Sequence, residues 1–174
     1  MRREFYVLAA LGAGFAIAHI ATVQAIPRAI MTFAARKIAE QADLDVNTFR
    51  LSPRITSQSQ TIVRPSPDLA YSLCLYDLSE GPINLIVAPW PVYSSVSFYD
   101  ARTNNFATLR AENGADILLT LKNSELSAGS AQERHVSPTR TGVILIRRLA
   151  PTEEDYDGVV SAAASDRCAA TKQS

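Results

Sequence analysis

The sequence predicts a mainly β protein: an antiparallel β-sandwich or barrel-like domain with an N-terminal transmembrane helix, a following amphipathic helix and a C-terminal helix. Three observations predict this class. They are an uncharged apolar run near the N-terminus, a change to two-residue periodicity after Thr61, and turn residues between the short apolar stretches that follow. A chain of 174 residues holds one ordinary domain and an appendage. We expect a signal-anchor over 1–27, a helix and connector over 28–60, and a β-domain over 61–174.

The uncharged run extends from Phe5 to Ile26 and follows Arg2 and Arg3. A helix of this length crosses the roughly 30 Å hydrocarbon core of a bilayer. A cleaved signal peptide, with Val23 and Ala25 before the cut, and an uncleaved anchor both fit. We favour the anchor, because the run exceeds the roughly 7–15 apolar residues of a signal-peptide core. A short N-terminal tail before the span then predicts a single-pass protein of the inner membrane, with its domain in the periplasm.

The segment after Pro27 has helical periodicity over 28–42. Its apolar side chains share one face of such a helix: Ile30, Phe33, Ala34 and Ile38. We expect this helix to lie along the membrane surface or to dock on the domain. The polar stretch 43–59, which contains Pro53, indicates a connector.

Strand patterns recur through the β-domain, separated by turn residues. They cover Leu69–Asp77, Ile83–Ala88, Val92–Asp100, Phe106–Arg110, Asp116–Leu121 and Gly142–Leu149. In the first of them the side chains alternate between two faces, which is typical of a half-buried strand. Short strands at this spacing, with no helical pattern between them, favour an antiparallel sandwich or barrel-like domain.

A helix closes the chain, with Thr152 as its N-cap and an acidic first turn. Its expected apolar stripe consists of Tyr156, Val159, Val160 and Ala163. Cys74 and Cys168 are the only cysteines. Outside the cytoplasm they could form a disulfide between the closing helix and the first strand, and otherwise both stay free.

The composition excludes several classes of function. Seventeen basic and seventeen acidic residues give no net charge, so the sequence predicts no nucleic-acid partner. No metal-binding or cofactor motif is present, and we expect neither a metal nor a cofactor. A Ser-His-Asp triad would have to combine His135 with a serine such as Ser72 or Ser97, and no spacing supports that.

Polar side chains gather at the predicted strand ends and form the candidate binding site. They are Arg64, Asp68, Tyr71, Asp77, Tyr99, Asp100, Arg102 and Asn105. Two carboxylates brought together would do acid and base chemistry, and arginine would hold an anion. The competing interpretation, which we favour, is structural. Aspartate and asparagine at strand ends usually accept hydrogen bonds from turn amides.

Three segments resemble the DUF1254 family: "VRPSPDLAYSLCLYDLSEGP", "VYSSVSFYDARTNNFATL" and "VSPTRTGVILIRR". The resemblance covers about Thr61 to Leu149, and the membrane span is similar to that of short, anchored members. It implies an all-β domain. Longer members carry a second β-domain, DUF1214, so the resemblance also suggests a separately encoded DUF1214-type partner. It supplies no established catalytic residues.

We therefore expect a membrane-anchored periplasmic module that binds or scaffolds, with a partner protein or with a small ligand near Asp68, Tyr71 and Asp100. The alternative is a hydrolase of the cell envelope that uses paired carboxylates. The surroundings of these carboxylates distinguish the two: convergence in a cleft favours the enzyme, and bonds to turn amides favour the scaffold.

Overall fold

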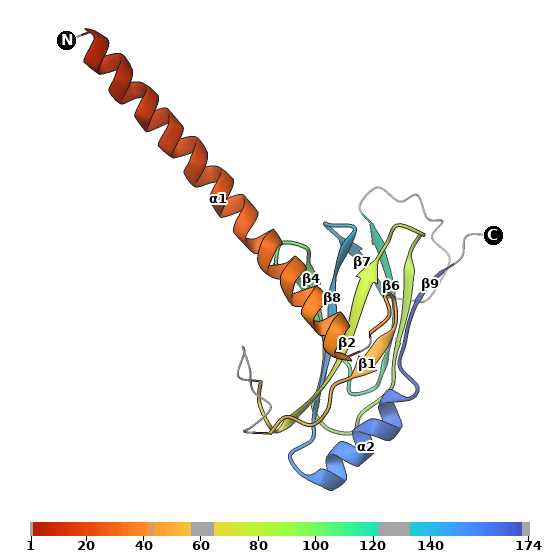
Figure 1. Ribbon diagram of the computed structural model, residues 1–174. Helices are drawn as coiled ribbons and strands as arrows, with labels where there is room; N and C mark the ends of the chain where they lie inside the picture. The colour runs from red at the N-terminus through yellow and green to blue at the C-terminus, as the bar shows by residue number, and fades with distance from the viewer. Residues whose placement is uncertain (1, 43, 57–64, 122–132, 172–174) are drawn as a thin grey trace.

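The computed structural model describes residues 2–42, 44–56, 65–121 and 133–171 (Figure 1). The elements follow one another as α1 (Arg2–Ala42), β1 (Phe49–Leu51), β2 (Leu69–Asp77), β3 (Ile83–Val87), β4 (Ser94–Asp100), β5 (Asn105–Arg110), β6 (Ala115–Leu121), β7 (Glu133–Ser137), β8 (Thr141–Leu149), α2 (Glu153–Ala163) and β9 (Arg167–Ala170).

The strands form two facing sheets (Figure 1). The five-stranded sheet has the order β1-β2-β8-β4-β5, and all its neighbours are antiparallel. The four-stranded sheet has the order β7-β6-β3-β9, in which only the β6–β7 pair is parallel. Within the described residues the sheets do not close into a barrel. The predicted mainly β sandwich is confirmed, with one parallel pair that the sequence did not indicate.

The core lies between the two sheets, and both contribute to it. Fully buried side chains of the first sheet, Val96, Phe98, Ile144 and Ile146, meet those of the second, Ile83, Leu85, Ile117 and Leu119. Burying one aliphatic side chain of this size stabilises a fold by roughly 1.5–3 kcal/mol. This layer is therefore the main source of stability for the domain.

Strand β2 shows the predicted alternation, with three small side chains and one tyrosine facing the core. The inward face consists of Ala70, Ser72, Cys74 and Tyr76. The leucines point outward, where Leu73 and Leu75 belong to the cluster that contains Met31 and Ala35 of helix α1. The Tyr76 ring passes over Gly142 of β8, where a Cβ atom would lie 2.4 Å from the Tyr76 hydroxyl. Only glycine leaves room for this ring.

A disulfide and a buried ion pair connect the two sheets near β9. A disulfide joins Cys74 of β2 to Cys168 of β9. Cys168 therefore lies on a strand and not on the closing helix, where the sequence had placed it. Arg148 of β8 forms a two-pronged ion pair with Asp166, at 2.7 and 2.8 Å, and both side chains are buried. Asp166 also accepts a hydrogen bond from the Ala88 amide, at 2.9 Å, so the pair fixes the loop after β3 as well.

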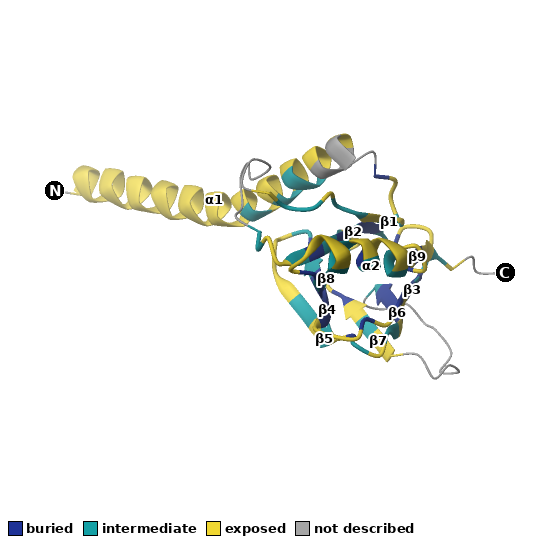
Figure 2. Cartoon of the chain, turned by 90° about the horizontal axis from the view of Figure 1, so that it is seen from below, coloured by how far each residue is buried: buried dark blue, intermediate teal, exposed yellow. Residues whose placement is uncertain are grey.

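Helix α1 is one continuous helix of 41 residues that passes through Pro27 without a break. The expected span and the expected amphipathic helix are thus one element. Proline is tolerated in membrane helices. The helix is long and apolar enough to cross a membrane over Arg2–Lys37. Figure 2 shows its N-terminal part exposed along its length and its C-terminal part beside the sheet.

The face of α1 that docks on the domain differs from the predicted one. Met31 and Ala35 pack against Leu75 and Val143 of the five-stranded sheet. Of the predicted stripe, Ala34 is half-buried, whereas Ile30 and Phe33 are 56% and 58% exposed. The side chain of Ile38 is not among those described.

Helix α2 covers one end of the sandwich (Figure 2). Thr152 caps the helix, as the sequence predicted, and it forms a reciprocal capping box with Asp155. Val159 is buried in a small cluster with Trp90, Ala70 and Ala150, whereas Val160 of the expected stripe is 47% exposed. The helix therefore covers the core at the lower end of the sandwich in Figure 1.

Candidate functional site

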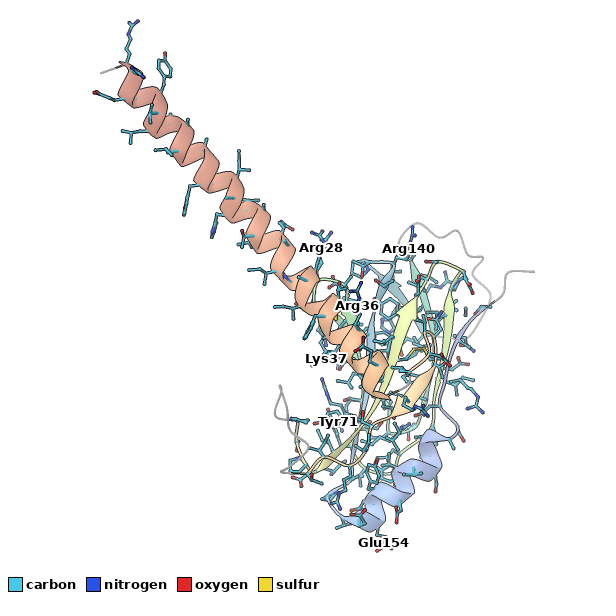
Figure 3. The ribbon with its side chains drawn as sticks, viewed as in Figure 1. Arg28, Arg36, Lys37, Tyr71, Arg140 and Glu154 are labelled. Carbon is cyan, nitrogen blue, oxygen red and sulfur yellow. A yellow bond between two sulfur atoms is a disulfide. The ribbon has the colours of Figure 1, made fainter. Side chains whose placement is uncertain are left out.

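The outer face of the five-stranded sheet, which looks away from the second sheet, is divided into two halves. One half is apolar and lies under α1, where Leu75 and Val143 meet the helix. The other half is polar, and in Figure 3 its residue Tyr71 lies clear of the helix. Strand register puts Tyr71, Arg147 and Ser95 in one row across β2, β8 and β4.

Arg147 is at the centre of the polar half. Its guanidinium donates from Nη2 to the Tyr99 hydroxyl at 2.9 Å and from Nη1 to the Ser97 hydroxyl at 3.5 Å. Ser97 also accepts from Thr108 of β5, and Thr108 accepts from Asn105. We call these five residues the Arg147 cluster. Within the described residues Arg147 forms no ion pair, although its side chain is half-buried.

The environment of Tyr99 reflects the nearby positive charge. Burial disfavours ionisation of this phenol, but a hydrogen bond with Asn105 and the charge of Arg147 outweigh that effect. The pKa of Tyr99 is consequently lower than that of an ordinary tyrosine. The site therefore stabilises negative charge at the tyrosine oxygen.

Small side chains form the floor beside Arg147. Ser95 and Ser97 are almost fully buried, at 2% and 1% exposure, although they point to the outer face. Ser95 accepts a hydrogen bond from Tyr93 at 2.9 Å. Arg110, at the edge of this face, is paired with Glu112. Among the residues that the structure describes, Arg147 thus differs from Arg110 in having only hydroxyl partners.

The predicted carboxylates do not converge. Asp77 ends β2, and its side chain accepts hydrogen bonds from the amide and hydroxyl of Ser79. Asp100 ends β4 and is buried, and it accepts from the amides of Arg102 and Asn104 and from the Asn104 side chain. Register places Asp77 on the outer face and Asp100 on the inner face. Each carboxylate therefore stabilises its own turn.

The remaining candidates are dispersed. Asp68 is exposed before β2, at the opposite end of that strand from Asp77. Tyr71 accepts a hydrogen bond from the Ser66 amide at 2.8 Å. Arg102 is exposed in the turn after β4. Arg64 lies outside the described residues. Of the predicted set, only Tyr99 and Asn105 enter the Arg147 cluster, with Tyr71 in the next strand.

His135 does not form a triad with Ser97. It lies on β7, stacks on Phe98 with ring centres 5.4 Å apart, and contacts Glu133 at 3.0 Å. Phe98 points into the core, so Ser97, its neighbour on β4, points to the opposite face. In the part of the chain that the structure describes, no three His, Cys, Asp or Glu side chains gather as metal ligands.

Sequence reasoning missed Arg147 and Thr108, and it considered Ser97 only as a serine of a catalytic triad. The signal for Arg147 was present in "GVILIRRL", because two consecutive arginines on a strand must point to opposite faces. One of them then has to enter the core, and the other has to lie on the outer surface. Ser97 and Thr108 had no such signal, since their pairing depends on strand order.

The fold and this site define a class of protein: a two-sheet β-domain that carries a long apolar helix and presents a polar sheet face beside that helix. Residues 46–170 match the model of the family described as "Protein of unknown function (DUF1254)". The chain belongs to this family, as its motifs had suggested. No curated protein matches the sequence.

Two solved structures are similar in fold. The VPA0106 protein from Vibrio parahaemolyticus has 13% sequence identity and a TM-score of 0.64, over 86% of this chain and 36% of that one. An uncharacterised protein from Burkholderia cenocepacia has 14% identity and a TM-score of 0.47, over 65% of this chain and 34% of that one. This chain thus spans about a third of the length of each. The first likeness supports the fold.

Proposed function

We propose that the protein is a membrane-tethered binding domain, and that the Arg147 cluster holds an anionic group of its ligand or partner. One observation carries this proposal. A half-buried guanidinium is oriented by neutral hydroxyls and has no ion pair within the described residues. Arginine in such a position offers its planar donors to carboxylate or phosphate oxygens.

The proposed location is the periplasmic side of the inner membrane. Arg2 and Arg3 precede the apolar part of α1, which favours a cytoplasmic N-terminus. The Cys74–Cys168 disulfide also supports an oxidising compartment for the domain. Protease added to spheroplasts should therefore digest the domain. Protection of the domain until the cells are lysed would contradict this orientation.

Anion binding is testable on the full chain in nanodiscs with ¹⁵N-labelled arginine. Inorganic phosphate and acetate serve as the probes, and the side-chain signals are followed by NMR. We expect saturable shifts of the Arg147 signal that are absent in Arg147→Gln. Arg102→Gln is the matched control, because Arg102 is exposed in the turn after β4. Shifts that vanish equally in Arg102→Gln, or that never saturate, would contradict the proposal.

Scaffolding of a DUF1214-type protein is a second candidate. Strand β5 favours it, because it pairs only with β4 within the described residues and leaves one strand edge open. Co-expression with a DUF1214-type protein and purification in mild detergent tests this candidate. A stable complex is expected, and independent elution of the two proteins would count against it.

The envelope hydrolase is less well supported than either candidate. Its paired carboxylates would have to meet in a cleft, whereas Asp77 and Asp100 each accept hydrogen bonds within their own turns. Asp100→Asn should therefore weaken the domain. A stable Asp100→Asn variant that lost a hydrolytic activity would restore the enzyme hypothesis.

A further inference from the structure

A pocket of about 240 Å³ lies between α1 and the apolar half of the outer sheet face. From the helix it is lined by Met31, Ala35 and Arg36, and from the sheet by Leu75 and Val143, among others. A space of this volume is far larger than a single water needs, so it has room for a chain of several groups, such as a segment of an acyl chain.

The lining is mainly apolar and contains one cation, Arg36, and one carboxylate, Asp77, with the hydroxyls of Thr32 and Thr141. Arg36 is exposed, and within the described residues it has no ion pair. Asp77 is the carboxylate of the lining, and its Oδ1 accepts hydrogen bonds from Ser79. Figure 3 shows Arg36 on the side of α1 toward the sheet. The pocket therefore suits a ligand with an apolar tail and an anionic head.

The position of the pocket brings it close to lipid. The uncharged run ends at Ile26, and Met31 follows on the same helix after about 7 Å, at 1.5 Å per residue. Headgroup layers extend roughly 5–8 Å beyond the hydrocarbon on each side. Away from the domain, Ile26, Ile30 and Phe33 are 50%, 56% and 58% exposed. This apolar stripe continues the lipid-compatible surface of α1 alongside the pocket.

We propose that the pocket binds the acyl chain of an anionic amphiphile, with Arg36 at its head. This inference rests on the membrane tether of the proposed function and does not depend on the Arg147 cluster. Both a phospholipid of the adjacent leaflet and a free fatty acid have this chemistry. In either case the chain fills the space between helix and sheet, and so couples the domain to the lipid surface.

The test uses the full chain in nanodiscs and photoactivatable diazirine probes, with labelled residues mapped by mass spectrometry. One arm carries a diazirine phosphatidylglycerol and the other a diazirine fatty acid, so that the two arms separate the sources. We expect label on both walls, in the segments around Met31–Arg36 and Val143. Label confined to the exposed residues of α1 in both arms would overturn the proposal.

Two variants sharpen the result. Ala35→Phe fills the pocket and should reduce sheet labelling about tenfold or more, because losing two buried methylene contacts already gives that factor. Ile30→Phe adds the same ring to the exposed face and should leave labelling unchanged. Unchanged sheet labelling in an Ala35→Phe protein that melts like the wild type would overturn the proposal.

The anionic head is tested separately. Arg36→Gln should reduce labelling by the two anionic probes and spare a diazirine phosphatidylcholine. Equal loss with all three probes would contradict the role of Arg36. Failure of the tether is distinguishable, because the protein would then not enter nanodiscs, whereas an empty pocket would leave incorporation and the phosphate response of Arg147 intact.

Discussion

Arg147 and Arg148 are neighbours on β8, yet they belong to different regions of the molecule. Arg148 points between the sheets, is 1% exposed, and is held by both oxygens of Asp166. Arg147 points to the outer face and is surrounded by hydroxyl groups. Strand alternation thus places the same side chain in a structural role on one face and, in our proposal, in a binding role on the other.

The difference lies in the partner. A buried arginine needs a full counter-charge, because desolvation of an unpaired ion costs several kcal/mol. A half-exposed arginine keeps part of its hydration and can remain without an internal anion. The presence or absence of a fixed carboxylate therefore distinguishes the two faces of this sheet.

The largest expected effect follows from breaking the inner region. Asp166→Ala leaves Arg148 buried without its partner and should lower the free energy of unfolding by about 3–5 kcal/mol. Chemical denaturation of the chain in detergent measures this change. Glu153→Ala is the control, since it removes an exposed ion pair with Arg54 and should cost at most about 1 kcal/mol. Similar losses in both variants would contradict the assigned difference.

Loss of the disulfide should come next. Cys74→Ser together with Cys168→Ser releases a link across 94 residues and should cost about 2–5 kcal/mol. The same denaturation experiment, run with and without reductant, measures this loss. Reductant should destabilise the wild type and have no effect on the double variant. A wild type that is insensitive to reductant when unfolded would show that the link does not form.

Arg147→Gln should have a smaller effect on stability, within about 1 kcal/mol, because its bonds are partly exposed. The same variant should lose the response to phosphate. This combination compares the two arginines directly. Arg147→Gln should abolish phosphate binding with little loss of stability, whereas removing the partner of Arg148 should lower stability. A loss as large as that of Asp166→Ala would place Arg147 among the structural residues instead.

The smallest expected effect is on the titration of Tyr99. Its pKa is below the ordinary value of 10.0, so in the folded chain it should ionise before Tyr76, whose pKa is raised chiefly by burial. Stabilisation from the lowered pKa is present at alkaline pH and is lost as pH falls through the folded-state value. Arg147→Gln should move the first tyrosine transition, followed by absorbance at 295 nm, to higher pH. An unchanged first transition would remove Arg147 as a cause.

The titration also bears on binding. A Tyr99 phenolate supplies Arg147 with an internal anion, so the affinity for phosphate should fall as pH rises through this transition. Tyr99→Phe should abolish that fall. Repeating the phosphate titration at neutral and alkaline pH checks this. A fall of equal size in Tyr99→Phe would assign the dependence to another group.

Much of the fold was predictable from local pattern. Strand β2 agrees with the prediction, and β8 differs by one residue, because alternating apolar runs bounded by turns define a strand locally. Strands β1, β7 and β9 were missed. All three are short and polar in part, and they form because a neighbouring strand offers them hydrogen bonds. Local sequence does not contain that information.

The site was less predictable than the fold. Asp77 and Asp100 attracted attention because aspartates resemble catalytic residues, although turns explain them. Arg147 combines with Tyr99, Ser97 and Thr108 only after β8, β4 and β5 have become neighbours. A cluster that spans three strands depends on sheet order, which periodicity does not reveal.

The Arg148–Asp166 ion pair and the Cys74–Cys168 disulfide, which both link the two sheets, are each completed by a residue near the C-terminus. Asp166 and Cys168 follow every strand of the five-stranded sheet, whereas their partners Arg148 and Cys74 precede them. A chain that leaves the ribosome N-terminus first therefore presents the long apolar helix and most of the sheets before either link can form. Until the residues after α2 emerge, Arg148 lacks the counter-charge of Asp166, and Cys74 stays reduced because Cys168 has not yet been made.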